Sequence, residues 1–305
     1  MTLKKFLMVG FVAAVLVACG GDGGSNPVNN PDEGSSSSVC KDCDGSNSSK
    51  GKSSSSSAKS SSSSAKSSSS VASSSSGEQS SSSVAYVEPC RTDSVDTCEY
   101  GELVDERDGQ TYKTVKIGTQ TWMAENLNYA YLQQTRSFDS ISWCYNDSVE
   151  YCTKYGRLYT WAAAMDSVGT WSANGKGCGY GKTCSPKFPV RGVCPEGWHL
   201  PTQTEGNTLF TAVGGELTAG KMLKSTSGWI ISGNGTDAYS FSALPAGRRF
   251  NKGGYYDEGH NAHFWSSTED DSDDAYDMYL FYYYAAALLT DFTKYNGFSV
   301  RCVKD

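Results

Sequence analysis

Histidine is scarce in this chain of 305 residues, which contains three of them. His260 and His263 lie in a glycine-flanked stretch and do not form the H-E-x-x-H helix of a zinc hydrolase. His199 stands between Trp198 and Leu200, and we expect it to be a packed core residue. The G-x-S-x-G elbow of serine hydrolases and a phosphate-binding loop are also missing. These absences give little support to metal, acyl-transfer or nucleotide chemistry.

Long hydrophobic runs are missing as well, which argues against a transmembrane helix. The apolar segment 6–18 follows Lys4 and Lys5 and has thirteen residues, which is typical of a secretory signal peptide. The sequence LVAC at 16–19 resembles a bacterial lipobox, whose cleavage leaves Cys19 as a lipidated N-terminus. An ordinary signal peptide followed by a chance cysteine is the alternative. We expect residues 1–18 to be removed and the protein to be lipid-anchored at the bacterial outer membrane or cell surface.

Basic residues are outnumbered by acidic ones, 26 to 33, so the formal net charge is −7. Removal of residues 1–18, which contain two lysines and no acids, moves the charge to −9. An acidic chain is a poor partner for nucleic acid and for anionic lipid head groups. Eleven cysteines fit an oxidising compartment, and lipidation of Cys19 leaves ten of them, an even number that suits disulfides.

A serine-rich segment separates the N-terminus from the rest of the chain. Serine occupies 22 of the 31 positions from 53 to 83. Such a segment has too little apolar surface to offset the entropy cost of ordering. We therefore expect residues 19–85 to be a disordered tether. Cys40 and Cys43 lie within it outside any thioredoxin-like context, which favours a local disulfide or a link between chains.

The folded region is expected to span residues 86–305, which is long enough for one hydrophobic core. Thr202 and Glu205 have capping-box spacing, and the apolar residues after them predict a helix that stops at Gly214 and Gly215. A short alanine-rich helix is also expected. About two helices among many short strands indicate an α+β fold with an antiparallel sheet. The alanine-rich helix is predicted at 161–165, and the strands at 111–117, 121–123, 240–244, 262–266, 276–284, 288–293 and 298–303.

Ten cysteines allow roughly nine hundred pairings in principle. Nearest-neighbour pairing in the folded region is our preference among them, and it gives three short loops and a long one. The expected bonds are Cys90–Cys98, Cys144–Cys152, Cys178–Cys184 and Cys194–Cys302. The last of these would close a loop of about a hundred residues and could contribute ~4–5 kcal/mol in the chain-entropy model.

Seven short motifs follow one another along the folded region. They are DGQTY (108–112), WMAENL (122–127), GRLYTW (156–161), CPEGWHLPT (194–202), LPAGR (244–248), FWSSTE (264–269) and GFSVRCV (297–303). Together they resemble the Fibrobacter succinogenes major paralogous domain (FISUMP) family of exported bacterial proteins, often lipoproteins with serine-rich linkers. The family often has tryptophan after the glutamate that starts the central helix, where this chain has Gly206. We expect this glycine to weaken the helix by up to ~1 kcal/mol and to remove a core-facing ring.

The resemblance implies a C-type lectin-like fold, which also includes the formylglycine-generating enzymes and typically joins its ends by a long-range disulfide. The Glu-Pro-Asn or Gln-Pro-Asp loop and the Trp-Asn-Asp strand of calcium-dependent lectins are missing here. The acidic stretch 270–274 could offer oxygen ligands to calcium, but a solvated turn is favoured. The formylglycine-generating enzymes need a metal-binding cysteine pair near the C-terminus, where this chain has Cys302 alone. We expect no metal and no cofactor.

The remaining functional signal is aromatic. The sequence has 7 tryptophans, 19 tyrosines and 11 phenylalanines, which suit both core packing and stacking on sugar faces. The predicted ligand-binding loop contains Arg248, Arg249, Tyr255, Tyr256 and Asp257. We expect a surface-anchored, non-catalytic binding or adhesion module for a carbohydrate or cell-wall polymer. The alternative is an enzyme or accessory factor related to the formylglycine-generating proteins.

Overall fold

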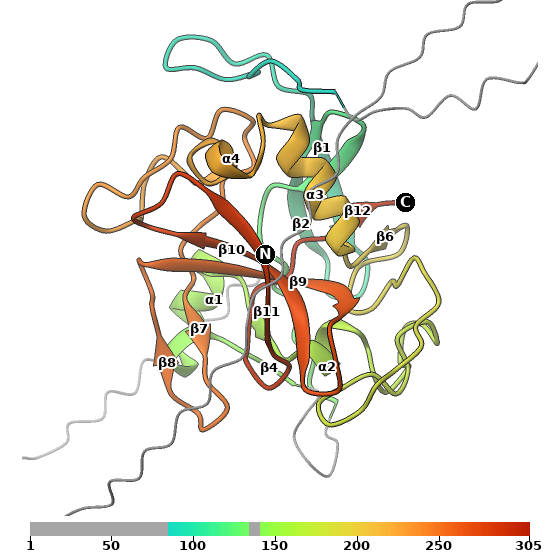
Figure 1. The fold of residues 1–305 in the computed structure, drawn as a ribbon. Coiled ribbons are helices and arrows are strands. Elements are labelled where there is room, and N and C mark those ends of the chain that lie inside the picture. Colours follow the sequence, from blue (N-terminus) through green and yellow to red (C-terminus); the bar gives the residue numbers. More distant parts are fainter. Residues whose placement is uncertain (1–84, 134–140) are drawn as a thin grey trace, which may run out of the picture. The chain divides into compact units, whose positions relative to one another are not determined.

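The computed structural model describes residues 85–133 and 141–305, which contain two main β-sheets. The larger sheet is antiparallel in the order β1-β2-β3-β12-β6 (Figure 1). Strands from the start and the end of the described region therefore lie side by side in it. Its members are β1 (Tyr100–Asp105), β2 (Gln110–Ile117), β3 (Gln120–Met123), β6 (Trp198–His199) and β12 (Val303–Lys304).

Two tight turns explain why β1, β2 and β3 form a meander. Gly109 and Gly118 have φ angles of +75° and +61°, which glycine adopts without the steric cost that other residues meet. Along β2 the side chains of Tyr112, Val115 and Ile117 are buried, and most of those between them are exposed. The strands predicted at 111–117 and 121–123 are confirmed.

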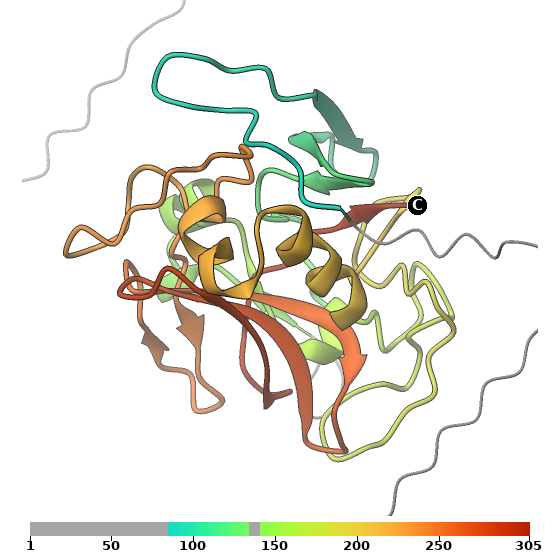
Figure 2. The same cartoon turned by 45° about the horizontal axis from the view of Figure 1, so that its top comes forward.

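Three longer strands form the second sheet, in the order β11-β10-β9. They are β9 (Asn261–Glu269), β10 (Asp274–Phe281) and β11 (Ala287–Thr293), and both pairings are antiparallel. Two helices, α3 (Gln203–Ala212) and α4 (Glu216–Leu223), lie between this sheet and the β1–β3 meander (Figure 2). Leu209 and Phe210 of α3 share one buried core with Trp122, Phe264 and Met278, so the helices join the two sheets.

The described residues contain four α-helices, two more than expected. The predicted pair corresponds to α2 (Trp161–Ala164) and α3, whereas the sequence patterns do not predict α1 (Val149–Tyr155) or α4. None of the helices in residues 85–133 and 141–305 is long and apolar enough to cross a membrane. Mostly antiparallel sheets with these helices confirm the α+β class.

Two short strand pairs border the main sheets. β4 (Ser142–Trp143) pairs with β5 (Leu158–Tyr159), and β7 (Arg248–Arg249) pairs with β8 (Tyr255–Tyr256). Between β4 and α1 lies a 3-10 turn, η1 (Tyr145–Asp147). Tyr145 of η1, Tyr155 of α1 and Leu158 of β5 share a small buried cluster, and Tyr255 of β8 packs against it.

Three of the predicted strands are wrong in whole or in part. Residues 240–244 form no strand, because two of their serines have φ of +53° and Ala243 alone makes an isolated bridge, to Lys224. In the segment predicted at 298–303, Phe298 and Ser299 make isolated bridges, residues 300–302 belong to no strand, and β12 begins only at Val303.

The strand predicted at 276–284 is correct only as far as Phe281, where β10 ends. The Lys224 ammonium accounts for this end, because it donates to the carbonyls of Phe281, Tyr282 and Tyr284 at 3.0–3.2 Å. Burial lowers the pKa of Lys224 to about 8. In a strand successive carbonyls point to opposite sides, so carbonyls that converge on one nitrogen indicate a turn in place of a strand.

All four expected disulfides of the folded region are present. The Cys194–Cys302 bond spans 108 residues and lies beside the paired strands β6 and β12. It therefore fixes the C-terminal strand in the larger sheet. The predictions for Cys19, Cys40 and Cys43 lie outside the described residues.

The stretch from Cys194 to Thr202 joins the disulfide, the sheet and the start of α3. The predicted capping box is present, since the Thr202 hydroxyl accepts from the Glu205 amide and the Glu205 carboxylate accepts from the Thr202 amide. His199 is buried, as expected, but it is more than a packing residue. Its Nδ1 lies 2.7 Å from Asp305 Oδ1 and its Nε2 lies 2.8 Å from Glu205 Oε1. His199 thus links the chain end to the helix start.

Gly206 is buried in the first half of α3. A β-carbon at this position would lie 2.9 Å from Leu289 Cδ2 and 3.3 Å from Leu289 Cδ1. Leu289 of β11 therefore occupies space that a larger side chain at 206 would need. The predicted helix forms in spite of the glycine, and packing from the adjacent sheet takes the place of the missing ring.

The contacts of His199 have consequences for stability against pH. Burial alone would lower the pKa of His199 from 6.5, but the hydrogen bonds and charges of Glu205 and Asp305 outweigh burial and raise it. Burial would raise the pKa of Glu205, yet hydrogen bonds from His199 and Thr202 hold it below 4.5. The charged His199 therefore adds its full contribution to the free energy of unfolding below pH 6.5. This contribution is lost as pH rises through the folded-state pKa of His199. The contribution of the ionised Glu205 to the free energy of unfolding is lost as pH falls through its lowered pKa.

We expect His199→Gln to lower the free energy of unfolding by about 1 kcal/mol more near pH 5.5 than near pH 9, because only the charged imidazole gains from both carboxylates. Urea unfolding of the wild type and the variant at the two pH values measures this difference. A loss of the same size at both values would show that His199 acts through packing alone.

Candidate functional site

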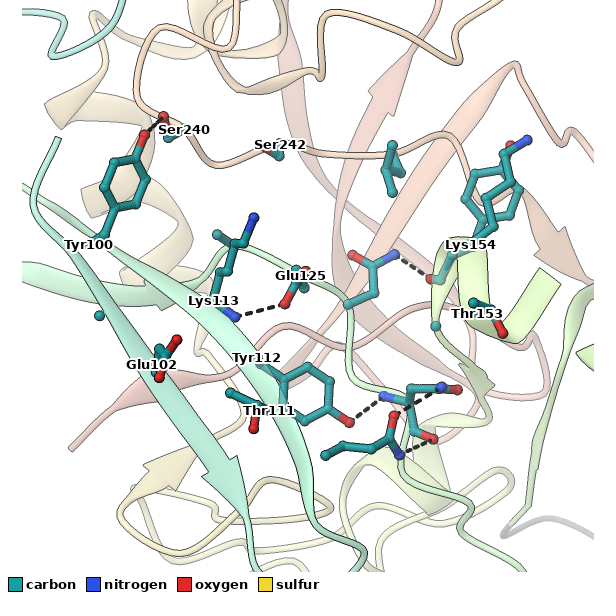
Figure 3. A pocket seen from close by; sticks show the side chains of 18 of the residues that line it. Tyr100, Glu102, Thr111, Tyr112, Lys113, Glu125, Thr153, Lys154, Ser240 and Ser242 are labelled. Atoms are coloured by element: carbon teal, nitrogen blue, oxygen red, sulfur yellow. Dashed lines mark hydrogen bonds between the residues drawn. The ribbon is translucent and has the colours of Figure 1, made fainter. Parts of the chain in front are cut away.

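A polar groove of about 890 Å³ lies beside the β1–β2 hairpin (Figure 3). Its walls come from β1 and β2, from residues 124–128 after β3, from the end of α1 and from residues 240–244. Three of the charged side chains that line it are acidic and three are basic, so they carry no formal net charge. They are Arg91, Asp96, Glu102, Lys113, Glu125 and Lys154.

Asn126 forms part of the floor of the groove and is buried. Its Nδ2 donates to the Tyr155 carbonyl at 2.7 Å and to the Ser299 hydroxyl at 3.3 Å. Its Oδ1 accepts a hydrogen bond of 2.8 Å from Arg301 Nε. Gly156 allows this close packing, because a β-carbon there would lie 2.8 Å from Asn126 Cβ. Both polar atoms of Asn126 are thus used to fix the floor.

Arg301 supports the floor from inside the domain, where its side chain is fully buried. Its two terminal nitrogens donate to the carbonyls of Phe241 and Ser242. The guanidinium also lies over the Phe241 ring, 4.4 Å from its centroid. Burial lowers the pKa of Arg301 to about 9, so the group stays charged at neutral pH. One cation therefore joins Asn126 to the 240–244 wall.

Side chains on the walls are held in place by neighbouring strands and loops. The Tyr100 hydroxyl donates to Asp96 Oδ2 at 2.7 Å and lies 2.6 Å from Ser240 Oγ. On the neighbouring strand β2, the backbone amide of Lys113 donates to Glu125 Oε2 at 2.7 Å (Figure 3). The carboxylate of Glu125 is therefore positioned at the groove although its side chain is exposed.

The groove presents hydrogen-bond donors and acceptors next to one another. Carboxylates accept, ammonium groups donate and hydroxyls do both, so the lining matches a hydroxyl-rich ligand better than an apolar or highly charged one. Within residues 85–133 and 141–305, no group of three or more histidine, cysteine or acidic side chains is placed to hold a metal ion. All eight cysteines in that part of the chain are in disulfides.

The structure brings the five predicted ligand-binding residues together in the β7–β8 hairpin and the residue after it. Arg248 Nε lies 2.8 Å from Asp257 Oδ2, so these two side chains form an ion pair within the hairpin. Tyr256 is 52% exposed and packs edge-on against Phe250. Its ring is the most accessible aromatic surface of the five residues.

The other two predicted residues are used mainly within the fold. The Arg249 guanidinium lies over the Trp143 ring at 3.8 Å from its centroid. The Tyr255 hydroxyl donates to Asp147 Oδ1 at 2.5 Å. These contacts attach the hairpin to β4 and η1 and leave Arg249 and Tyr255 little surface for a ligand.

The hairpin is connected to one end of the groove through Glu258, which follows it. Glu258 Oε1 accepts from the Tyr155 hydroxyl at 2.5 Å and lies 3.4 Å from Lys154 Nζ, and both partners line the groove. Sequence reasoning did not select the groove residues, although the WMAENL motif contains Glu125 and Asn126. That motif is the sequence signal that could have led to the groove.

The role of Arg301 can be measured. Lysine keeps the charge but lacks the fork that reaches three separate oxygens. We expect Arg301→Lys to lower the free energy of unfolding by roughly 2–4 kcal/mol, because buried oxygens lose a charged donor. Arg191→Lys is the matched control, at a half-buried arginine that donates to the Cys194 carbonyl, and should cost less than about 1 kcal/mol. Urea unfolding compares the two, and equal losses would contradict the role given to Arg301.

Comparison with known proteins identifies the family of the chain. The family model of the Fibrobacter succinogenes major domain matches residues 115–304, which include the end of β2, all of β3 to β12, Asn126 and Arg301. Comparison with curated proteins and with solved structures gave no match, so the C-type lectin-like fold stays a prediction. The match spans more than half of the chain and all but the first of the motifs. The chain belongs to the Fibrobacter succinogenes major domain family.

Proposed function

We propose that this domain is a non-catalytic binding module whose ligand is a carbohydrate or a similar hydroxyl-rich polymer. The observation that carries the proposal is the groove of about 890 Å³ with its balanced charges. Its floor is fixed by the hydrogen bond between Asn126 and Arg301. A preorganised surface loses little entropy on binding, which favours a ligand whose individual contacts are weak.

The charged side chains of the groove supply both halves of a sugar hydroxyl's hydrogen bonding. Glu102 and Glu125 would accept from hydroxyl groups, and Lys113 and Lys154 would donate to them. Because acids and bases are equal in number, a neutral sugar chain is favoured over an acidic or a basic one. No residue of the groove needs to change its protonation state for this role.

Two tyrosines near the groove offer faces for stacking on a sugar ring. Tyr100 lines the groove and is 50% exposed, and Tyr256 of the hairpin is 52% exposed. The Glu258 contacts to Lys154 and Tyr155 hold the hairpin at one end of the groove. A polymer chain in the groove could therefore extend over Tyr256, and it would then also contact the hairpin that the sequence predicts to bind the ligand.

Binding to cell-wall or environmental polymers requires display at the cell surface. We infer lipid anchoring at Cys19 from the LVAC sequence, with the serine-rich stretch between the anchor and the folded domain. Cys19→Ser is expected to abolish the incorporation of labelled palmitate into the protein, because the thiol that carries the lipid would be lost. Metabolic labelling of expressing cells measures this, and a wild type without label, or a variant labelled like the wild type, would contradict the anchor.

Glycan-array binding of the full chain, with and without EDTA, tests the binding function. We expect binding to neutral polysaccharide that survives EDTA, since the calcium-lectin motifs are missing. The Glu102→Gln/Glu125→Gln double variant should bind at least about tenfold more weakly, because two charge-assisted hydrogen bonds are weakened. Glu216→Gln, at an exposed carboxylate on α4 outside the groove, is the matched control and should bind like the wild type.

Each outcome decides a separate part of the proposal. Failure of the wild type to bind any polysaccharide or cell surface would remove the binding function. Unchanged affinity in the double variant would remove the groove as its site, and Tyr256→Ala then tests the hairpin alone. Loss of wild-type binding in EDTA would indicate a calcium-dependent lectin instead.

A further inference from the structure

A buried ammonium lies at the centre of the acidic turn between β9 and β10. The side chain of Lys294, directly after β11, has no exposed surface. Its Nζ lies 2.6 Å from Glu269 Oε1. The carbonyl oxygens of Asp271, Ser272 and Lys182 lie 2.5, 3.0 and 3.3 Å from the same nitrogen. One carboxylate oxygen and three carbonyl oxygens thus converge on a single cation.

The turn is folded around this cation by its own hydrogen bonds. Asp271 Oδ1 accepts from the amides of Asp273 and Asp274 at 2.7 and 2.8 Å, and these bonds lower the pKa of Asp271. The Lys294 amide donates to the Asp273 carbonyl at 2.9 Å. Backbone and side chain of Lys294 therefore both bind the turn. Its acidic side chains are at least partly exposed, as expected of a solvated turn, but its inner side is filled.

The oxygen atoms around Lys294 are those that a hard metal cation uses. Calcium takes six to eight carboxylate, carbonyl and water oxygens, typically at about 2.3–2.6 Å. An ammonium has three N–H donors, whereas four oxygens lie within 3.3 Å of Lys294 Nζ. Lys294 Nζ is therefore surrounded by more oxygen atoms than an ion pair with Glu269 alone would supply.

We propose that Lys294 is a tethered cation that takes the place of a calcium ion in this turn. Its ammonium offsets the charge of Glu269 and joins the turn to residues 182–184, which end at the Cys178–Cys184 disulfide. The turn keeps its shape without metal, and removal of the Lys294 side chain converts it into a calcium site. None of these oxygen donors lines the groove, so the inference is independent of the binding function.

Lys294→Ala in the full chain tests the inference, with Ca²⁺ as the probe. Alanine leaves the four oxygens in place and opens the space between them. At about 100 times its Kd, Ca²⁺ should then raise the melting temperature by roughly 5–10 °C. Lys294→Met is the matched control, because its uncharged side chain fills the same space. Neither this variant nor the wild type should respond.

Terbium emission provides a second readout. The Trp161 ring lies 4.7 Å from Lys294 Nζ, so Tb³⁺ bound to Lys294→Ala should show tryptophan-sensitised emission that Ca²⁺ abolishes. If Lys294→Ala is unfolded in EDTA, Ca²⁺ should restore the wild-type circular dichroism, since binding then drives folding. The inference fails if the folded variant responds to neither ion, if Ca²⁺ cannot refold an unfolded variant, or if the wild type responds equally.

Discussion

The buried guanidinium of Arg301 is the contact on which the rest of the domain depends. It donates to Asn126 and to the carbonyls of Phe241 and Ser242. These partners lie 175, 60 and 59 residues away in the chain. Without the arginine, the acceptor oxygens of these three residues would have no donor inside the core, where water cannot replace it. The floor of the groove is fixed because Asn126 and the 240–244 wall are both bound to this one charge.

Two other buried basic side chains also donate to several oxygen atoms of packed loops. Lys224 binds three carbonyls at and after the end of β10, and Lys294 binds three carbonyls and a carboxylate around the β9–β10 turn. Loops that are packed into a domain need partners for carbonyls that no strand ladder supplies. Burial disfavours such charges, as the lowered pKa of Lys224 shows, and the converging oxygens offset that cost. Long basic side chains thus hold a loop-rich fold together where regular structure is short.

This explains which parts of the fold could be predicted from the sequence. The strands at 111–117 and 121–123, the capping box and the short disulfides depend on residues close together in the chain, and they are confirmed. The 240–244 segment and the end of β10 depend on Arg301 and Lys224, whose partners are 57 to 60 residues away. Local alternation favours a strand at both places, and long-range contacts override it. No local pattern reports such contacts.

The candidate site also depends on contacts between residues far apart in the chain, which local sequence patterns do not report. The sequence favours the hairpin as a binding surface because arginine and tyrosine are common in such surfaces. In the fold, however, Arg249 packs on Trp143 and Tyr255 donates to Asp147. The groove escaped notice because its charged residues come from separate elements and become neighbours only in the fold. Glu102, Lys113 and Glu125 of the groove are exposed, whereas of the two predicted hairpin tyrosines only Tyr256 is. We therefore propose the groove as the binding site, with Tyr256 as the part of the hairpin that could extend it.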